Sequence, residues 1–213
     1  MPGNFYFNNW RKCSMPKSET TRSYHHGNLA AVIRQAAWDI VGESGVRGLS
    51  LRECARRANV SHSAPAHHFG SMDNLLSEVA ADGYERLIEI ISAVQTEVKD
   101  PMMGAGLGYV KFATTYPHHF RLMLGGDGAT RSLPRLLKSG EAALQQLRQS
   151  IHTAWIAQNG AEPDPALLEQ RTLLAWSTAH GYASLAIDRK PDEMSSIPPE
   201  VVFKPMTSIL LAP

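Results

Sequence analysis

Between Ser61 and His67 the chain carries small and hydrogen-bonding side chains in place of large apolar ones. Imidazole and hydroxyl groups donate and accept hydrogen bonds, and alanine methyl groups make apolar contacts. These groups suit contact with the edges of nucleic-acid bases, although residues 62–69 lack the Arg, Asn and Gln that contact bases in bidentate fashion. The candidates for such contact are Ser61, His62, Ser63, Ala64, Ala66 and His67.

Metal binding and catalysis are the alternative chemistries for these residue types. His67 and His68 are neighbours, so on a helix their side chains point about 100° apart, and no Cys or carboxylate stands four residues further on. Residues 100–213 show no carboxylate pair, nucleophile–base set or metal-ligand spacing. We therefore expect no metal, no cofactor and no enzyme activity.

A short helix before the run is predicted from Ser50. Ser50 and Glu53 form an S-x-x-E pattern, which begins a helix as a capping box. Apolar residues then recur at helical spacing up to Ala58. Asn59 tolerates a left-handed backbone and can end the helix in a tight turn.

A second short helix is predicted over residues 62–69, with Ser61 as its cap. Pro65 lies near its first turn, where the missing N–H is tolerated. His68 and Phe69 are expected to pack inward, and Ser71 to cap a third, longer helix. Two short helices joined by about three residues, the second with small polar side chains, indicate a DNA-reading helix-turn-helix.

The segment from about residue 24 to residue 80 resembles the DNA-binding region of the TetR/AcrR family of transcriptional repressors. Three positions depart from the usual family pattern: Asn59 replaces Gly, Ala66 replaces Tyr and Met72 replaces Lys. The string YHHGNL before the first helix also recurs in one TetR subgroup. The matching positions are Ser50, Cys54, Ala55, Ala58, Val60, Ser61, Pro65, His68, Phe69, Ser71 and Leu75.

The resemblance implies a homodimer that binds a pseudo-palindromic DNA operator and is released by a small-molecule inducer. It also implies dimerisation through the last two helices. Further DNA contacts are expected at the start of the first helix, where free N–H groups can hold a phosphate, and around the helix-turn-helix. These additional candidates are Tyr24, His25, His26, Ser50, Arg52 and Ser71.

Charge is divided unevenly along the chain, whose formal net charge is +1. Residues 1–70 hold nine Lys/Arg against four Asp/Glu, a net +5, and five of the nine histidines. Residues 71–213 hold twelve against sixteen, a net −4. The basic charge thus accompanies the helix-turn-helix, where phosphate neutralisation requires it.

The chain is predicted to be all-α, with a mobile arm at 1–22, a three-helix head at 23–72 and a helical bundle at 73–213 for ligand binding and dimerisation. The first helix is expected from about Asn28 to Glu43, with an apolar stripe that includes Val32. Pro101 and Pro117 separate the helices that follow 73–99, and the glycines at 104, 106 and 108 are interpreted as helix-entry flexibility. The remaining helices are expected at 133–158, 166–187 and 199–211.

A ligand pocket is predicted between the helices that begin near residues 106, 133 and 166. Trp176, His180 and Gly181 resemble the Trp-His-Gly element of one TetR C-terminal domain type, although a Trp–His pair satisfied inside the bundle is the alternative. The same aromatic residues could instead fill an ordinary core. The candidate lining residues are Tyr109, Phe112, Met123, Trp155, Trp176 and His180.

Other functional classes remain as alternatives: an all-α enzyme or ligand carrier with a structural helix-turn-helix, and a DNA-binding regulator controlled by a protein partner. No run of 18 apolar residues occurs, so no membrane span is expected. The N-terminal stretch lacks the apolar region of a secretory signal. Cys13 and Cys54 stand apart, which favours a reducing cytoplasm over a disulfide framework.

Overall fold

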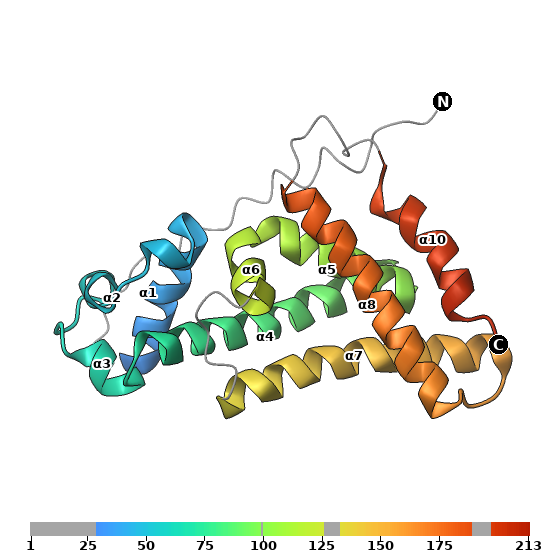
Figure 1. Ribbon diagram of the computed structural model, residues 1–213, viewed down its shortest axis with the longest axis horizontal. Coiled ribbons are helices and arrows are strands. Elements are labelled where there is room, and N and C mark those ends of the chain that lie inside the picture. Colours follow the sequence, from blue (N-terminus) through green and yellow to red (C-terminus); the bar gives the residue numbers. More distant parts are fainter. Residues whose placement is uncertain (1–28, 99, 126–132, 189–196) are drawn as a thin grey trace.

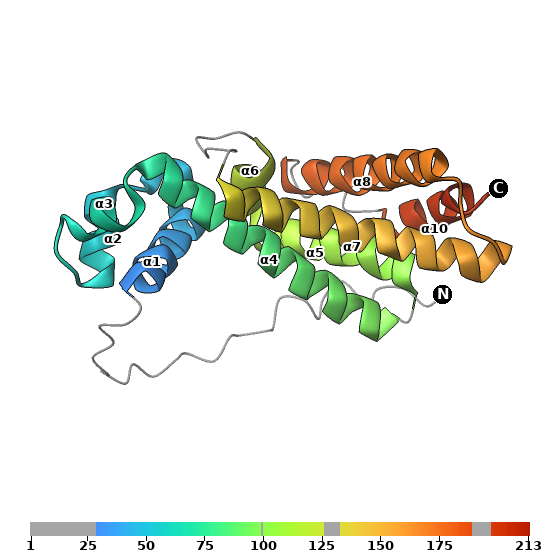
Figure 2. The ribbon, with the colours of Figure 1, turned by 90° about the horizontal axis from the view of Figure 1, so that it is seen from below.

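The computed structural model describes residues 29–98, 100–125, 133–188 and 197–213. The described residues form helices and turns without a strand, which confirms the all-α prediction. A small head occupies one end of the molecule, and α4 runs from it along the helical body (Figures 1 and 2). The helices are α1 Leu29–Ser44, α2 Leu51–Ala58, α3 Ala64–Phe69, α4 Met72–Val98, α5 Pro101–Thr115, α6 Pro117–Gly125, α7 Pro134–Asn159, α8 Pro165–Asp188 and α10 Pro199–Leu210, with a short 3-10 turn η2 at Val46–Gly48.

Prolines begin most of the body helices. Pro101 starts α5, and the Asp100 side chain accepts hydrogen bonds from the N–H groups of Met102 and Met103, both at 3.0 Å. Proline suits this first turn because its missing N–H has no partner there in any case. The helix boundaries predicted at the prolines are therefore confirmed to within a residue or two.

Helix α1 packs one narrow stripe against the rest of the molecule. Its buried residues follow the predicted spacing, but Val32 is 44% exposed and lies outside the stripe, which corrects the prediction. The buried set is Ile33, Ala36, Ala37, Ile40 and Val41.

The glycines of α5 permit close helix packing and are buried, so their interpretation as helix-entry flexibility was wrong. A Cβ at Gly104 would lie 2.6 Å from the Cα of Gln95, and one at Gly108 would lie 2.7 Å from the Cα of Ile91, both on α4. The four-residue spacing puts these two glycines on one face. Helices α4 and α5 therefore approach at backbone distance.

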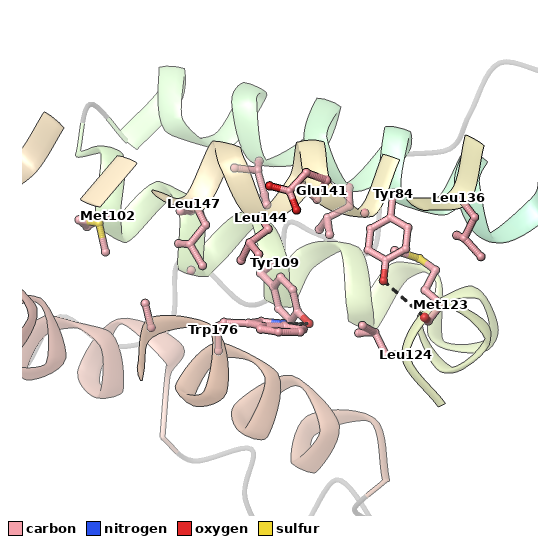
Figure 3. A pocket seen from close by; sticks show the side chains of 18 of the residues that line it. Tyr84, Met102, Tyr109, Met123, Leu124, Leu136, Glu141, Leu144, Leu147 and Trp176 are labelled. Atoms are coloured by element: carbon pink, nitrogen blue, oxygen red, sulfur yellow. Dashed lines mark hydrogen bonds between the residues drawn. The ribbon is translucent and has the colours of Figure 1, made fainter. Parts of the chain in front are cut away.

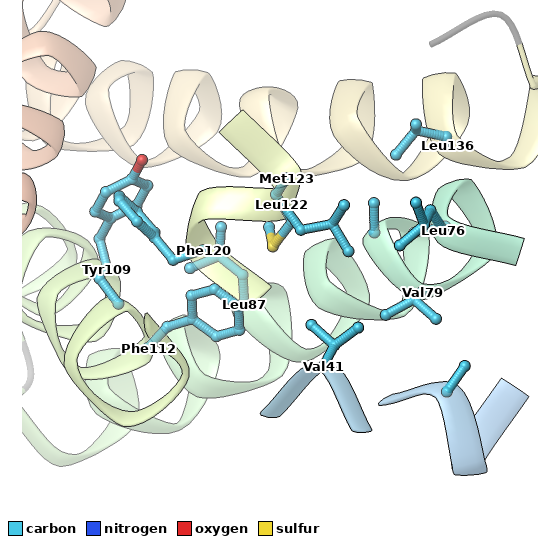
Figure 4. Close-up of a cluster of buried hydrophobic side chains, with 14 of the residues drawn as sticks. Val41, Leu76, Val79, Leu87, Tyr109, Phe112, Phe120, Leu122, Met123 and Leu136 are labelled. Carbon is cyan, nitrogen blue, oxygen red and sulfur yellow. The ribbon is translucent and has the colours of Figure 1, made fainter. Parts of the chain in front are cut away.

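The head and the body share one hydrophobic core. Figure 4 shows Val41 of α1 beside Val79 of α4, with Phe112 of α5 and Leu122 of α6 in the same cluster. All four side chains are at most 1% exposed. Displacement of α4 or α6 would consequently disturb the packing of the head.

Candidate functional site

The turn between α2 and α3 has the geometry that the sequence predicted. Asn59 adopts the left-handed conformation, with φ 54° and ψ 47°, and the N–H of Val60 donates to the carbonyl of Ala55 at 3.0 Å. This bond satisfies a carbonyl that the helix end would otherwise leave open. Val60 is half-buried against the core and fixes the start of the next segment.

Helix α3 begins at Ala64, two residues later than predicted. Its N-cap, Ser63, makes no side-chain capping bond, and the Ser61 Oγ lies 3.3 Å from the Ser63 Oγ instead of capping the helix. Ala64 and Pro65 are buried, so Ala64 faces the head and not the exposed surface where a base contact was predicted.

The exposed surface around α3 is polar and rich in imidazole. His68 belongs to this surface, contrary to the expectation that it packs inward, whereas Phe69 does pack against the core. No group of three His, Cys, Asp or Glu in the described part of the chain could hold a metal ion. The exposed residues are Ser61, His62, Ser63, Ala66, His67 and His68.

The caps that flank this surface are only partly as predicted. Ser50 Oγ accepts a hydrogen bond from the Glu53 N–H at 3.1 Å, and Ser71 Oγ accepts one from the Asn74 N–H at 3.1 Å. The Glu53 carboxylate does not return to Ser50, because it binds Arg56 at 2.6 Å and Arg57 at 3.1 Å. These hydrogen bonds lower the pKa of Glu53 to about 2. The capping box is thus half-formed.

The arginines of the head fall into two groups. Arg57 bridges Glu53 of α2 and Glu43 of α1, the latter at 2.6 Å, so it braces the two helices. Arg47 and Arg52 are exposed and form no ion pair within the described residues. They are the two head arginines whose charge no carboxylate neutralises within the described residues. Tyr24, His25 and His26, like the arm predicted at residues 1–22, lie outside the described residues.

A pocket of about 370 Å³ lies in the body between α4, α5, α6, α7, α8 and α10 (Figure 3). Its volume falls within the range of small-molecule sites, and its wall is mainly aliphatic and aromatic. The lining residues are Tyr84, Leu87, Ile91, Met102, Ala105, Gly106, Tyr109, Met123, Leu124, Leu136, Leu137, Gly140, Glu141, Ala143, Leu144, Leu147, Ala175, Trp176, Ala179 and Met206.

Hydrogen bonds already engage the polar side chains of the aromatic wall. The Trp176 Nε1–H donates to Tyr109 Oη at 3.3 Å, and Tyr109 Oη lies 3.1 Å from His180 Nδ1. On the opposite side, Tyr84 donates to the carbonyl of Met123 at 3.4 Å (Figure 3). Burial raises the pKa of Tyr109, so its hydroxyl stays protonated.

Three predicted pocket residues, Tyr109, Met123 and Trp176, line the cavity. His180 stands behind Tyr109, outside the lining. Phe112, fully buried, and Trp155, 6% exposed, pack elsewhere in the body. The α4 contribution was missed, although its apolar periodicity could have indicated which face turns toward the neighbouring helices.

Comparison with known proteins first identifies the class of protein: a two-part regulatory protein with an N-terminal DNA-binding module. Residues 33–79 match the model for bacterial regulatory proteins of the tetR family, and residues 102–209 match a tetracyclin repressor-like C-terminal domain. The second match spans about half of the chain. The protein belongs to the TetR family.

Relatives differ in how much of the chain they resemble. The HTH-type transcriptional repressor Rv3405c of Mycobacterium tuberculosis is 41% identical over 51 residues, which cover 24% of this chain and 27% of that protein. The HTH-type regulator YobS of Bacillus subtilis is 25% identical over 186 residues, covering 77% of this chain and 96% of its own. A Rhodococcus protein of unknown function matches with a TM-score of 0.72 and 28% identity over 90% of this chain and 97% of its own.

The structure of the multidrug binding protein EbrR with proflavin shares the fold, with a TM-score of 0.54 and 16% identity over 85% of this chain and 97% of its own.

Among the described residues, no helix is both long enough and apolar enough to span a membrane.

Proposed function

We propose that this protein is a transcriptional repressor that binds an operator as a homodimer and leaves it when a small molecule fills the pocket. The observation that carries the proposal is the shared core: helices that line the pocket also pack against the head. α4 supplies both Tyr84 to the pocket and Val79 to the contact with α1. A change in the pocket therefore has a direct physical route to the DNA-binding surface.

Release requires that the ligand bind more tightly to a conformation of the protein that binds the operator less tightly. In α6, Met123 lines the pocket, and four residues earlier His119 contacts Trp38 of α1. A ligand that pushes Met123 outward would shift α6 and with it the head. The 370 Å³ cavity favours this ligand control over control by a protein partner.

The second copy in the proposed dimer would cover the outer face of α8 and α10. Figure 2 shows α8 along the outer edge of the body. Leu173 of α8 and Val201 of α10 are both 60% exposed, and Ile209 of α10 is 55% exposed, so both helices leave large apolar side chains uncovered. Gly181 faces open space, so a partner helix could approach there.

The Trp-His-Gly element would then join the two functions on α8. Trp176 and His180 meet Tyr109 at the pocket wall, while Gly181 faces outward. Gly181→Arg adds a charged side chain without a clash inside the protomer, so we expect it to give monomers by light scattering. Ala142→Arg, at an exposed position of α7, adds the same charge and should leave a dimer.

The DNA-binding proposal is tested by an electrophoretic shift on the DNA upstream of the chain's own reading frame. We expect specific binding, with affinity falling as salt rises because phosphate contacts release counterions. Arg52→Gln should lower the slope of log affinity against log salt by about one. Arg56→Gln is the matched control: because Arg56 is paired with Glu53, its loss should change the slope less.

Failure of the protein to prefer its upstream DNA over scrambled DNA, across several fragments, would remove the repressor assignment. A slope that responds equally to both arginine substitutions would leave repression intact but reject the assignment of phosphate contacts.

A further inference from the structure

We propose that the pocket takes an apolar aromatic cation, a ring compound carrying an amine, with its charged nitrogen toward Glu141. The inference rests on the proposed function, since it assigns a chemical class to the ligand of the same pocket. Three independent features support it: the charge around the cavity, the hydrogen bonds of its wall and its aromatic side chains.

Negative charge predominates around the cavity. Among the described residues, Glu141 is the charged member of the lining, and Figure 3 shows its carboxylate above the aromatic wall. Arg148 lies 3.7 Å from Glu141 but binds Glu169 by two hydrogen bonds at 2.6 and 3.2 Å. One guanidinium thus serves two carboxylates, which leaves this group with a net charge of −1.

A second charged group, beside Tyr84 and Leu136 of the lining, has the same sign. Arg135 binds three carboxylates of α4, and Arg34 is the second arginine beside them. Three negative charges thus face two positive charges, so this cluster again carries a net charge of −1. Both groups of charges therefore favour a cation over an anion. The cluster consists of Glu78, Asp82, Glu85, Arg34 and Arg135.

An anionic ligand would also lack free donors among the described side chains that line the cavity. The Trp176 N–H is engaged with Tyr109 and the Tyr84 hydroxyl proton with the Met123 carbonyl. A carboxylate or phosphate would have to break one of these bonds or stay unpaired, which is costly in an apolar site. An amine needs only an acceptor, and Glu141 provides one.

The aromatic side chains suit a flat cation. Tyr84, Tyr109 and Trp176 line the cavity, and the π faces of Tyr and Trp attract positive charge within about 6 Å. The remaining aliphatic wall, from Leu87 to Leu147, would bury the rings. A small hydrophilic amine would leave this wall uncovered and should bind poorly.

The test uses one ring system in three charge states at pH 7.5: 9-aminoacridine as the cation, acridine as the neutral compound and acridine-9-carboxylate as the anion. Calorimetric titration of the full-length protein should give an affinity for the cation at least about tenfold above that for acridine, with the carboxylate weakest. Bound cation should also release the upstream DNA.

Glu141→Gln keeps the shape and removes the charge. Because the carboxylate is 68% exposed, we expect only about a fivefold loss of 9-aminoacridine affinity, reduced at high salt, and no change for acridine. The matched control is Glu162→Gln, which removes a carboxylate of similar exposure, 75%, that binds His152 away from the pocket and should alter neither affinity.

Equal affinity for the three compounds, preference for the carboxylate, no binding of any of them, or a cation affinity unchanged by Glu141→Gln would overturn the proposal. Operator binding is scored in the same samples, so the repressor assignment fails only if the DNA is not bound. Gly140→Trp tests whether the cation binds inside this pocket. A Cβ at this position would lie 3.7 Å from the Tyr84 ring, so the indole would fill the cavity and should abolish cation binding.

Discussion

Helix α1 meets the body through two contacts of opposite chemistry. Toward α4, beside the buried packing of Val41 against Val79, the contact is ionic: Arg34 Nε binds Asp82 Oδ2 at 2.8 Å, and these side chains remain 29% and 24% exposed. Toward α6 it is aromatic and buried. His119, 2% exposed, stacks on Trp38 with ring centroids 3.7 Å apart, and its Nε2–H donates to the Trp38 carbonyl at 3.0 Å.

The two contacts should respond to different conditions. Salt screens the partly exposed ion pairs and lowers their contribution, whereas it leaves buried packing almost unchanged. Protons act on the other contact. Because His119 Nε2 carries the hydrogen, Nδ1 is a bare acceptor, and it has no partner among the described residues. Protonation would bury an unpaired charge there, so burial lowers the pKa of His119 to about 4.

The largest effect is expected from His119→Ala. The substitution removes the stacked ring and the hydrogen bond to Trp38 and leaves a cavity, which should lower the free energy of unfolding by about 3 kcal/mol. His118, next along α6 and only half-buried, is the matched control, and His118→Ala should cost less than about 1 kcal/mol. Urea denaturation at equal protein concentration measures both. Similar losses would show that α6 is held elsewhere.

The second largest effect is expected from acid, which should weaken the aromatic contact between His119 and Trp38. The unfolded state takes up a proton near pH 6.5 and the folded state only near pH 4, so this contribution is complete above pH 6.5 and falls as the pH drops between these values. Between pH 7 and pH 5 the loss should be roughly 2 kcal/mol. His119→Phe, which keeps a ring but cannot titrate, should remove that part of the pH dependence. An unaltered dependence would mean that His119 titrates normally.

Salt should act on the ionic contact, with a smaller effect. Arg135→Met leaves Glu78, Asp82 and Glu85 facing Arg34 alone, and should lower the free energy of unfolding by about 1 kcal/mol, discounted because the Arg135 side chain is 30% exposed. The loss should shrink when NaCl rises from 0.05 to 0.5 M. The His119→Ala loss, measured in parallel, should not shrink. The opposite pattern would reverse the assignment of the two contacts.

The sequence predicts elements better than it predicts contacts. Helix boundaries at Pro101 and Pro117 and the left-handed Asn59 follow from local backbone chemistry, and the structure confirms them. The start of α3 was misplaced because Ser61 and Ser63 are equally good caps in sequence. The role of Gly104 depends on a partner helix that no local pattern reveals.

The candidate sites show the same difference between features set by local sequence and features set by contacts between distant helices. The helix-turn-helix is a local motif, so its exposed surface could be predicted apart from Ala64 and His68, whose orientation depends on where the helix begins. The pocket is formed by several helices, and Leu87 or Ile91 would look identical in a solid core. Nothing in the pair His118–His119 indicates which ring is buried.

The smallest expected effect is the coupling between Arg34 and Arg135 through Asp82. Arg135 binds Asp82 Oδ1 and Arg34 binds Oδ2, so one carboxylate joins the α7 end of the pocket to the head. After loss of one arginine the carboxylate is held by the other alone, and loss of the second leaves it unpaired. The double variant Arg34→Met/Arg135→Met should therefore lose about 0.5 kcal/mol more than the sum of the single losses.

Urea denaturation of the wild type, the two single variants and the double variant gives this coupling free energy, and repetition in an Asp82→Asn background is the control. A coupling that survives Asp82→Asn would have to pass through Glu78, which both arginines also approach. Strict additivity would mean that the two arginines stabilise the head and the pocket separately, and the ionic contact could then carry no signal between them.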